Sequence, residues 1–363
     1  MKIEELALQR NKYKHLSDEE WRWFLQQVEG RERTADKLPT FAAIEDWWYP
    51  VRLSCEQCSS ELTARYKTSL VSGDQMVDLT AGYGVDTFFL SEQFEHTDYV
   101  EQNAELCRIA EHNFAGKPIT IHNTTAEAFL ASSGQYDLIF ADPARRDNHG
   151  GKVFKLADCT PNIVELLPSL LQHGKRLMLK LSPMLDISQA VKELSAVNWD
   201  IHVIAIKNEV KEVLLLSEGT GKITAIDLAE PEKAFVFTKE EEQQADWRLE
   251  IGDWKFLYEP SASILKAGAY KLVAQRYGLQ KVDINTHLYA SDQLVENFPG
   301  RVWQIDESRE SRAKSQANVL CRNYPLTPEQ LKKKLKIKDG GDVYVIGCRV
   351  AGKPTLFYAE RIN

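Results

Sequence analysis

The stretch Met76-Val-Asp-Leu-Thr-Ala-Gly-Tyr-Gly-Val-Asp-Thr87 decides how the rest of this chain is interpreted. A short apolar run ends at Ala81-Gly-Tyr-Gly84, and an amphipathic segment with Phe88 and Phe89 follows. This order predicts a strand, a tight glycine turn and a helix. Glycines are needed in such a turn because the chain reverses sharply and a ligand approaches bare backbone. The turn also directs the first N–H groups of the helix at whatever binds there.

The residues around the turn indicate which kind of ligand it could hold. A dinucleotide fingerprint, Gly-x-Gly-x-x-Gly, requires a third glycine, and this chain has Thr87 at that position. Asp78 precedes the glycines, and Glu101 follows Gly82 by nineteen residues, at the end of a second apolar stretch. A carboxylate at the tip of the second strand can accept hydrogen bonds from the two hydroxyls of a ribose.

A further predicted strand, residues 136–141, ends in Asp142-Pro143. With this motif, residues 70–217 resemble the class I S-adenosylmethionine-dependent methyltransferases, because the family's marks occur in the family's order: Gly82 with Gly84, Glu101, Asn123 and Asp142-Pro143. The resemblance implies methyl transfer as the reaction and S-adenosyl-L-methionine as the cofactor. The alternative is a purely structural α/β layer, since glycine turns often serve packing alone.

The resemblance also carries a role to each matching residue. Gly82 and Gly84 would let the backbone approach the cofactor, and Glu101 would bind the ribose hydroxyls. Asp78 would orient the turn or bind the methionine amino group through water, and Asn123 would bind the exocyclic amine of adenine. The expected cofactor-binding residues are Asp78, Thr80, Ala81, Gly82, Gly84, Glu101, Gln102, Asn123, Asp142 and Arg65.

Arg65 and Lys67 are both considered because a helix before the first strand often closes over the cofactor in similar methyltransferases, and a cation there could meet the methionine carboxylate. Arg65 is the one included in the set, and a solvated helix face is the alternative for both residues. Residues 1–70 as a whole are predicted to form a helical N-terminal cap, since Ser17 and Glu20 make a capping box before residues with helical spacing.

Asp142-Pro143-Ala144-Arg145 is expected to face the substrate. In amino-methylating families a similar Asp/Asn-Pro-Pro-aromatic motif binds the target NH2, but here alanine and arginine replace the second proline and the aromatic residue. The Asp-Pro-x-Arg form resembles RNA methyltransferases that act on pyrimidine C5, which need a nucleophilic cysteine after the fifth strand. This chain has Leu181-Ser-Pro183 there, and the nearby Cys159 is predicted to be structural. We therefore favour attack by a nitrogen lone pair, with Asp142, Pro143 and Arg145 as the catalytic residues.

The most basic stretch is Lys332-Lys-Lys-Leu-Lys-Ile-Lys338, which could contact phosphates without reading sequence or could be a merely solvated helix face. The end of the chain resembles the THUMP-like module that ends a group of bacterial class I methyltransferases, and true THUMP domains bind RNA. The expected substrate-binding residues are Arg145, Arg146, Lys180, Lys332, Lys333 and Lys334.

Alternating strands and helices from residue 76 to residue 217 predict an α/β fold with a doubly wound, Rossmann-like methyltransferase sheet. Seven strands are expected, and the short connection at residues 207–210 makes the last strand antiparallel. The predicted domains are the helical cap at 1–70, the cofactor-binding domain at 71–220, a linker or small ferredoxin-like α+β region at 221–300, and the THUMP-like α+β module at 301–363.

Composition sets further bounds on the 363-residue chain. Its 43% hydrophobic and 27% charged residues are typical of a soluble globular protein, and its net charge of −8 argues against a wholly basic nucleic-acid-coating protein without excluding RNA as a substrate. The chain has no apolar run of roughly eighteen residues or more, so we expect no membrane span. Six cysteines without secretory features indicate reduced thiols in a cytoplasm. Cys55-x-x-Cys58 has half the spacing of a zinc site and no second pair follows, so no metal is expected.

The leading hypothesis is an S-adenosylmethionine-dependent methyltransferase that modifies a base nitrogen of RNA, with the C-terminal module as an RNA anchor. Methylation of a small molecule or a protein is the second hypothesis. The third is a non-catalytic RNA-binding protein that retains the fold. The complete set of glycines and carboxylates argues against the third, and the oligomeric state stays open.

Overall fold

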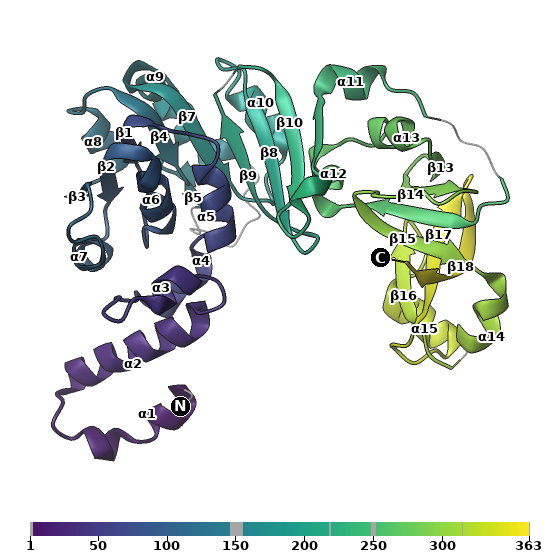
Figure 1. The fold of residues 1–363 in the computed structure, drawn as a ribbon, viewed down its shortest axis with the longest axis horizontal. Coiled ribbons are helices and arrows are strands. Elements are labelled where there is room, and N and C mark those ends of the chain that lie inside the picture. The colour runs from purple at the N-terminus through teal and green to yellow at the C-terminus, as the bar shows by residue number, and fades with distance from the viewer. Residues whose placement is uncertain (1–2, 146–154, 218, 248–251, 314, 363) are drawn as a thin grey trace. The chain divides into compact units, whose positions relative to one another are not determined.

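The structure is a computed structural model that describes residues 3–145, 155–217, 219–247, 252–313 and 315–362 (Figure 1). The chain divides into two compact units. The first contains Met1–Trp199 and Leu214–Gly219, and the second contains Asp200–Val213 and Thr220–Asn363. No helix in the described ranges has both the length and the apolar content that a bilayer crossing requires.

The first unit begins with a series of helices, and aromatic residues of this region contact the glycine turn. These helices are α1 (Ile3–Ala7), η1 (Arg10–Tyr13), α2 (Asp18–Thr34), α3 (Pro39–Ala43), α4 (Arg52–Gln57) and α5 (Glu61–Thr68). The predicted capping box of Ser17 and Glu20 begins α2. Trp47 and Phe41 are buried with their ring centroids 4.1 Å apart, and Trp47 Nε1 donates a hydrogen bond to Tyr83 Oη at 2.8 Å. The N-terminal helices are therefore anchored to the middle residue of the Gly-Tyr-Gly turn.

A nine-stranded sheet forms the centre of the α/β fold, in the order β11-β10-β8-β9-β7-β4-β1-β2-β3. β1, β2, β3, β4 and β7 pair in parallel. The bounds are β1 (Gly73–Asp78), β2 (Phe94–Glu101), β3 (Ile119–Asn123), β4 (Tyr136–Ala141), β7 (Gly174–Leu181), β8 (Asp200–Ile206), β9 (Glu209–Leu216), β10 (Lys222–Asp227) and β11 (Phe235–Thr238). The predicted doubly wound α/β sheet is confirmed.

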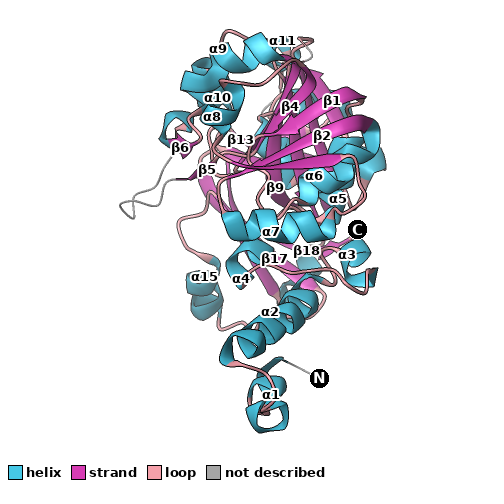
Figure 2. Ribbon diagram, turned by 90° about the vertical axis from the view of Figure 1, so that its left-hand side faces the viewer, coloured by secondary structure: helices cyan, strands magenta, loops and turns pink. Residues whose placement is uncertain are grey.

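Helices cover both faces of the sheet in the first unit (Figure 2). α5, α6 (Val85–Leu90) and α7 (Ala104–Asn113) lie on one side, and α8 (Ala126–Leu130), α9 (Ile163–His173) and α10 (Ile187–Glu193) lie on the other. The remaining short elements are η2 (Ser91–Gln93), β5 (Ala144–Arg145), η3 (Leu156–Asp158) and β6 (Cys159–Thr160). Cover on both faces explains the apolar runs within the central strands, such as Leu138–Ala141 of β4 and Val213–Leu216 of β9.

The sheet is longer than the seven strands expected because the chain after residue 217 returns to it. Lys207 and Asn208, with φ of 51° and 64°, make a two-residue turn of the kind that joins antiparallel strands, so β9 follows β8 more tightly than predicted. Thr220 then donates to the Asp200 carboxylate at the start of β8, Oγ1 to Oδ1 at 2.7 Å. This contact brings β10 beside β8 in parallel, and β11 pairs antiparallel with β10. The chain from Thr220 onward therefore continues the sheet, where an end of the sheet had been expected.

The second unit contains a seven-stranded sheet in the order β13-β14-β12-β15-β18-β17-β16. Its strands are β12 (Phe256–Pro260), β13 (Gln280–Asp283), β14 (Thr286–Ser291), β15 (Gly300–Ile305), β16 (Asn318–Arg322), β17 (Val343–Val350) and β18 (Lys353–Arg361). Its helices are η4 (Pro231–Lys233), α11 (Lys239–Gln244), α12 (Ala262–Ala267), α13 (Leu272–Tyr277), η5 (Glu307–Arg309), α14 (Glu310–Ala313) and α15 (Pro328–Leu335).

One strand joins the two regions of this unit that the sequence separates at residue 300. β15 pairs antiparallel with β12 on one side and with β18 on the other, so the sheet is continuous across that boundary. Gly300 begins β15 where a Cβ atom would lie 2.1 Å from the Glu259 carbonyl oxygen, which only glycine tolerates. A hydrogen bond also links two strands that are far apart in the strand order: the Ala351 N–H, just after β17, donates to the Val282 carbonyl of β13 at 3.1 Å.

Candidate functional site

A cavity of about 270 Å³ lies in the first unit, where β1, β2 and β4 end. Ligands bind at this edge in open α/β sheets because the loops after parallel strands meet there. The residues predicted from the sequence that line it are Asp78, Thr80, Ala81, Gly82, Gly84, Glu101, Gln102, Asp142 and Lys180. Segments far apart in the sequence, from Ser54 to Lys180, therefore line the same cavity.

Glu101 holds the glycine turn in its bent form. Its Oε2 accepts a hydrogen bond from the Gly82 N–H at 3.0 Å, and its Oε1 accepts one from the Asn103 N–H at 2.8 Å. Tyr99 Oη donates to the Gly82 carbonyl at 2.5 Å. Gly82 and Gly84 have φ of 57° and 81°, in the left-handed region that favours glycine. The carboxylate thus lies directly beside the turn, with lone pairs left on both oxygens.

Asp78, at the end of β1, supports the glycine turn through hydrogen bonds, and the residue is only 1% exposed. Its Oδ1 accepts from the Thr80 N–H at 3.0 Å, and its Oδ2 accepts from Thr87 Oγ1 at 2.6 Å. Burial raises the pKa of Asp78 to about 7, although both hydrogen bonds act to lower the pKa. Both oxygens are therefore bonded within the turn. These contacts match the first of the two predicted roles, that of orienting the turn.

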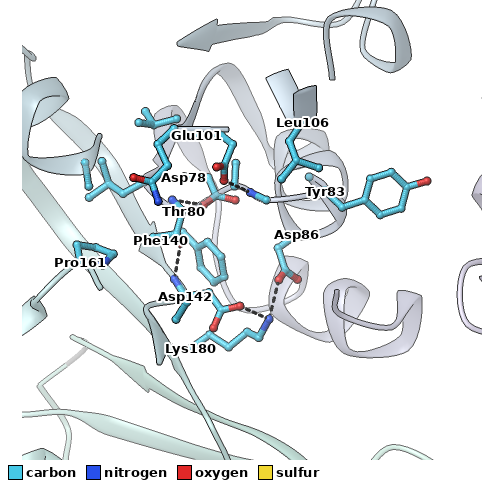
Figure 3. A pocket seen from close by; sticks show the side chains of 18 of the residues that line it. Asp78, Thr80, Tyr83, Asp86, Glu101, Leu106, Phe140, Asp142, Pro161 and Lys180 are labelled. Carbon is cyan, nitrogen blue, oxygen red and sulfur yellow. Dashed lines mark hydrogen bonds and ion pairs between the residues drawn. The ribbon is translucent and has the colours of Figure 1, made fainter. Parts of the chain in front are cut away.

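Asp142 directly follows β4 and is held by a chain of alternating charges (Figure 3). Lys180 Nζ lies 2.6 Å from Asp142 Oδ2 and 3.4 Å from Asp86 Oδ2. Lys67 Nζ lies 3.1 Å from Asp86 Oδ1, and Ser59 Oγ donates to Asp86 Oδ2 at 2.6 Å. Two ammonium groups thus alternate with two carboxylates, which limits the cost of burying them.

Burial acts to raise the pKa of Asp86, but the ammonium groups of Lys67 and Lys180 outweigh it and hold the pKa below the usual value. The Lys67 side chain is 0% exposed and the Asp86 side chain 8% exposed, so both charges depend on each other. The Asp142 side chain is 38% exposed at the open end of this chain. The ion-pair network therefore presents the partly exposed Asp142 carboxylate to the cavity.

The sequence reasoning missed Ser59 and Asp86, and it considered Lys67 only as a cation for the methionine carboxylate. Asp86 stands in the first turn of α6, where an acidic residue is ordinary. The burial of Lys67 follows from the helix period, because it lies three positions after Ala64, and residues so spaced share one face of a helix. Ala64 and Lys67 are both fully buried.

Arg65 does not line the cavity, which corrects the expectation for it. It lies two positions from Lys67 on α5 and therefore on a different face. Its Nε pairs with Glu61 Oε1 at 2.8 Å, and its guanidinium carbon lies 4.6 Å from the centre of the Phe89 ring. The buried cation of this helix at the site is Lys67 instead.

Asn123 also lies outside the residues that line the cavity. Its Nδ2 donates to the Glu101 carbonyl at 3.0 Å, and its side chain is otherwise exposed. Residues 124–127, which follow it, form the wall in its place. Asn123 and Glu101 are paired across β2 and β3, so the Asn123 amide can bond the Glu101 backbone.

The other expected substrate residues are placed as follows. Pro143 does not line the cavity, although its neighbour Ala144 does. The backbone of Arg145 belongs to β5, its side chain is not described, and Arg146 lies outside the described residues. Lys332, Lys333 and Lys334 belong to α15 in the second unit, where Lys332 pairs with Asp339 at 2.6 Å and the other two are exposed.

The described residues offer neither a metal-binding group nor an activated cysteine at the cavity. Among the described residues, no three His, Cys, Asp or Glu side chains form a group that could hold a metal ion. Cys58 lines the cavity, but burial raises the pKa of its thiol, and burial raises the pKa of Cys55 to about 12. A thiol with a raised pKa is a poor nucleophile near neutral pH.

The two glycines of the turn should differ in their tolerance of a side chain. A Cβ atom on Gly84 would lie 2.6 Å from Phe114 Cζ, whereas one on Gly82 would meet only the Thr80 carbonyl oxygen at 3.8 Å. We expect Gly82→Ala to lower the free energy of unfolding by about 1–2 kcal/mol, the cost of a left-handed residue. Gly84→Ala should cost a further 1–3 kcal/mol, roughly, from overpacking. Chemical denaturation of both variants measures this, and equal losses would contradict the packing argument.

The raised pKa of Asp78 should give a pH-dependent stability difference. Between the usual pKa of 3.8 and the folded-state pKa of about 7, the folded chain holds a proton that the unfolded chain has released. The contribution of Asp78 to stability therefore falls as the pH rises through this window. Asp78→Asn does not titrate and can still accept from Thr80 and donate to Thr87. The variant should gain about 2 kcal/mol on the wild type between pH 5 and pH 8. Urea unfolding at the two pH values measures this, and a pH-independent difference would show that Asp78 stays ionised.

Comparisons with known proteins agree with this geometry. A crystal structure of a presumed methyltransferase from Porphyromonas gingivalis W83 has a TM-score of 0.86 and is 33% identical, covering 96% of this chain and 92% of that chain. Two proteins from strains of Mycobacterium tuberculosis, each named an uncharacterized S-adenosylmethionine-dependent methyltransferase, are 22% identical over 354 residues, which is 90% of this chain and 92% of theirs.

Two family models match the second unit. A ferredoxin-like domain matches residues 256–299, and a THUMP domain-like model matches residues 297–361. The two matches together cover the seven-stranded sheet and meet at residues 297–299, just before β15, the strand that joins its two halves. The chain therefore belongs to the S-adenosylmethionine-dependent methyltransferases that carry a C-terminal THUMP-like domain, and S-adenosyl-L-methionine is its cofactor.

Proposed function

We propose that this methyltransferase transfers a methyl group to a base nitrogen of RNA. The observation that carries the proposal is the Asp142 carboxylate, which is accessible at the cavity while Lys180 holds one of its oxygens at 2.6 Å. A fixed carboxylate with a second oxygen available can accept a hydrogen bond from an amino or imino group and so orient a nitrogen lone pair.

The residues of the cavity fit the cofactor in chemistry. We propose that Glu101 accepts hydrogen bonds from the ribose hydroxyls and that Gly82 offers its open side to the cofactor, since a Cβ there would meet only one atom within 4 Å. Apolar side chains suited to an adenine ring, Val100 and Leu106, line the same wall as residues 124–127. Bound S-adenosylmethionine supplies a methyl group on a positively charged sulfur, open to in-line attack.

The rest of the catalysis is positioning by the chain's own groups. Thr80 Oγ1 accepts a hydrogen bond from the Asp142 N–H at 2.6 Å, which joins the backbone after β4 to the glycine turn after β1. Lys180 restrains the Asp142 side chain from β7. Backbone and side chain are thus both restrained, so the carboxylate needs little reorganisation to hold a substrate N–H group.

The cysteines favour a nitrogen target over pyrimidine C5. A C5 methyltransferase needs a thiolate that adds to the base. Cys58 has a raised pKa and donates from Sγ to the Cys55 carbonyl at 3.1 Å, while Cys159 is 1% exposed and does not line the cavity. Neither cysteine has the surroundings of an activated nucleophile.

RNA as the substrate is supported by features of the second unit. Its end matches a THUMP domain-like model, and α15 presents Lys333 and Lys334 to solvent. Exposed cations of this kind can neutralise phosphates without reading a sequence. We propose a cytoplasmic location for the reaction. This is supported by the six cysteines, all of which are free thiols.

Transfer of a labelled methyl group from S-adenosylmethionine into unmodified total RNA tests the reaction. We expect label in one nucleoside after digestion, on a nitrogen of its base. Asp142→Asn should lower the rate by about 10²–10⁴ because the amide is a weaker acceptor for the substrate N–H. Asp74→Asn, an exposed carboxylate on the same sheet, is the matched control and should keep full activity.

The outcomes separate the alternatives. Label on a pyrimidine carbon would contradict the nitrogen target, and full activity of Asp142→Asn would remove its proposed role. No label in RNA from a protein that still binds the cofactor would refute RNA as the substrate. A small molecule or a protein would then be the acceptor to seek.

The two exposed lysines of α15 should contribute to the salt dependence of RNA binding. We expect Lys333→Gln/Lys334→Gln to reduce the slope of log affinity against log salt by about 1.4, since each phosphate contact on a single strand contributes about 0.7. Titration of a labelled RNA at several salt concentrations measures the slope. Lys239→Gln/Lys353→Gln removes two exposed lysines elsewhere in the unit and serves as the control. An unchanged slope would reduce α15 to a solvated helix.

A further inference from the structure

A second cavity, of about 370 Å³, lies wholly within the second unit and shares no residue with the first. Four cationic residues line it, each from a different element: Lys207 from the β8–β9 turn, Lys233 from η4, Arg301 from β15 and Arg361 from β18. Two carboxylates, Asp227 and Glu230, line it as well. The cations therefore outnumber the carboxylates in a chain whose net charge is −8.

Both carboxylates are already engaged. Asp227 accepts backbone N–H hydrogen bonds from Lys207 at 2.9 Å, Asn208 at 2.5 Å and Ala229 at 3.0 Å. The Glu230 carboxylate pairs with Lys233 Nζ at 2.6 Å. Asp227 is thus a structural residue of the turn, and the charge of Glu230 is balanced by that of one lysine.

The arginine beside the cavity shares its counter-ion. Arg301 Nε lies 3.5 Å from Glu259 Oε2, and Arg322 Nε pairs with the other oxygen of the same carboxylate. Glu259 is 4% exposed and therefore buried between two guanidinium groups. One negative charge faces two positive charges, so this cluster carries a net positive charge.

Lys207 adds a cation that stands apart from these pairs. Its side chain is exposed, and no carboxylate of the described residues lies within ion-pair distance of its Nζ. Its backbone is fixed, because Asp227 accepts from its N–H and the neighbouring Asn208 Oδ1 accepts from the Ala262 N–H at 2.7 Å. The turn therefore presents Lys207 from a rigid position.

Arg361 is placed next to Arg301 by the register of the sheet. It pairs with Trp303 across β15 and β18, and Arg301 lies two residues before Trp303 on the same face. Diagonal neighbours of this kind are close enough for long side chains to reach one ligand. Two guanidinium groups and one ammonium group are thus directed from fixed strands and a fixed turn at one hollow.

We propose that this cavity binds a backbone phosphate of RNA, an inference that rests on the proposed RNA substrate. Phosphate oxygens accept charge-assisted hydrogen bonds from guanidinium and ammonium groups, and arginine can bind two oxygens at once. The fixed positions of the donors reduce the ordering cost of binding. The site adds a contact to RNA that is separate in sequence and structure from the lysines of α15.

Equilibrium binding of a fluorescein-labelled, mixed-sequence, single-stranded RNA to the full chain tests the proposal. Lys207→Gln/Arg361→Gln removes two cations that the structure places outside the methyl-transfer cavity. We expect its Kd at low salt to rise about tenfold and its salt slope to fall by about 0.7, the value for one phosphate. Lys239→Gln/Lys353→Gln, with the same loss of charge at exposed positions, should bind within about twofold of the wild type.

The remaining outcomes each decide one point. Equal Kd values for the cavity variant and the control would overturn the proposal. Inorganic phosphate provides the second probe: if it raised the melting temperature of the wild type but not of the cavity variant, while RNA bound both equally, the cavity would take free phosphate and the RNA assignment would fail. Binding is read without methyl transfer, so a protein that methylates RNA while both variants bind it equally would lose only this inference. A wild type that methylates no RNA, with the binding loss still seen, would lose only the proposed reaction.

Discussion

The candidate active site depends on one buried carboxylate, that of Asp86. Lys67 lies 3.1 Å from its Oδ1 and Lys180 lies 3.4 Å from its Oδ2, and Lys180 in turn holds Asp142. Removal of a single partner would leave a charge buried without compensation, which costs several kcal/mol by general experience, about 3–5. The geometry of the Asp142 carboxylate therefore depends on an ion pair between two other side chains, those of Lys67 and Asp86.

The same network explains how a small turn becomes a binding site. Glu101 and Asp78 both bond backbone N–H groups of the glycine turn, and Thr80 accepts from the Asp142 N–H. The loops after β1, β2 and β4 are thereby joined into one surface. The hydrogen bond from Trp47 to Tyr83 joins the N-terminal helical region to this surface, so the cap is part of the site's support.

The second unit is organised differently, around a continuous sheet and charges that are shared unequally. Gly300 lets β15 lie against β12, and β15 then carries Arg301 to the edge of the basic cavity. The two carboxylates of this cavity, Asp227 and Glu230, are already bonded to groups of the protein, while cations such as Lys207 are exposed to solvent. A chain that is acidic as a whole can in this way keep a local surface for anions.

The sequence by itself determined what depends on near neighbours: the strand–turn–helix around Gly82 and Gly84, the capping box at Ser17, and the order of alternating strands and helices. These follow from local sterics and periodicity, which a short stretch contains in full. Only the tertiary structure decided which cation meets Asp142 and which helix face is buried. Ser59, Asp86 and Lys180 are brought together from the loop before α5, from α6 and from β7. The local patterns of Ser59 and Asp86 do not distinguish them from ordinary surface or capping residues. The addition of β10 and β11 to the sheet was decided in the same way, because strand pairing depends on hydrogen bonds between segments distant in the sequence.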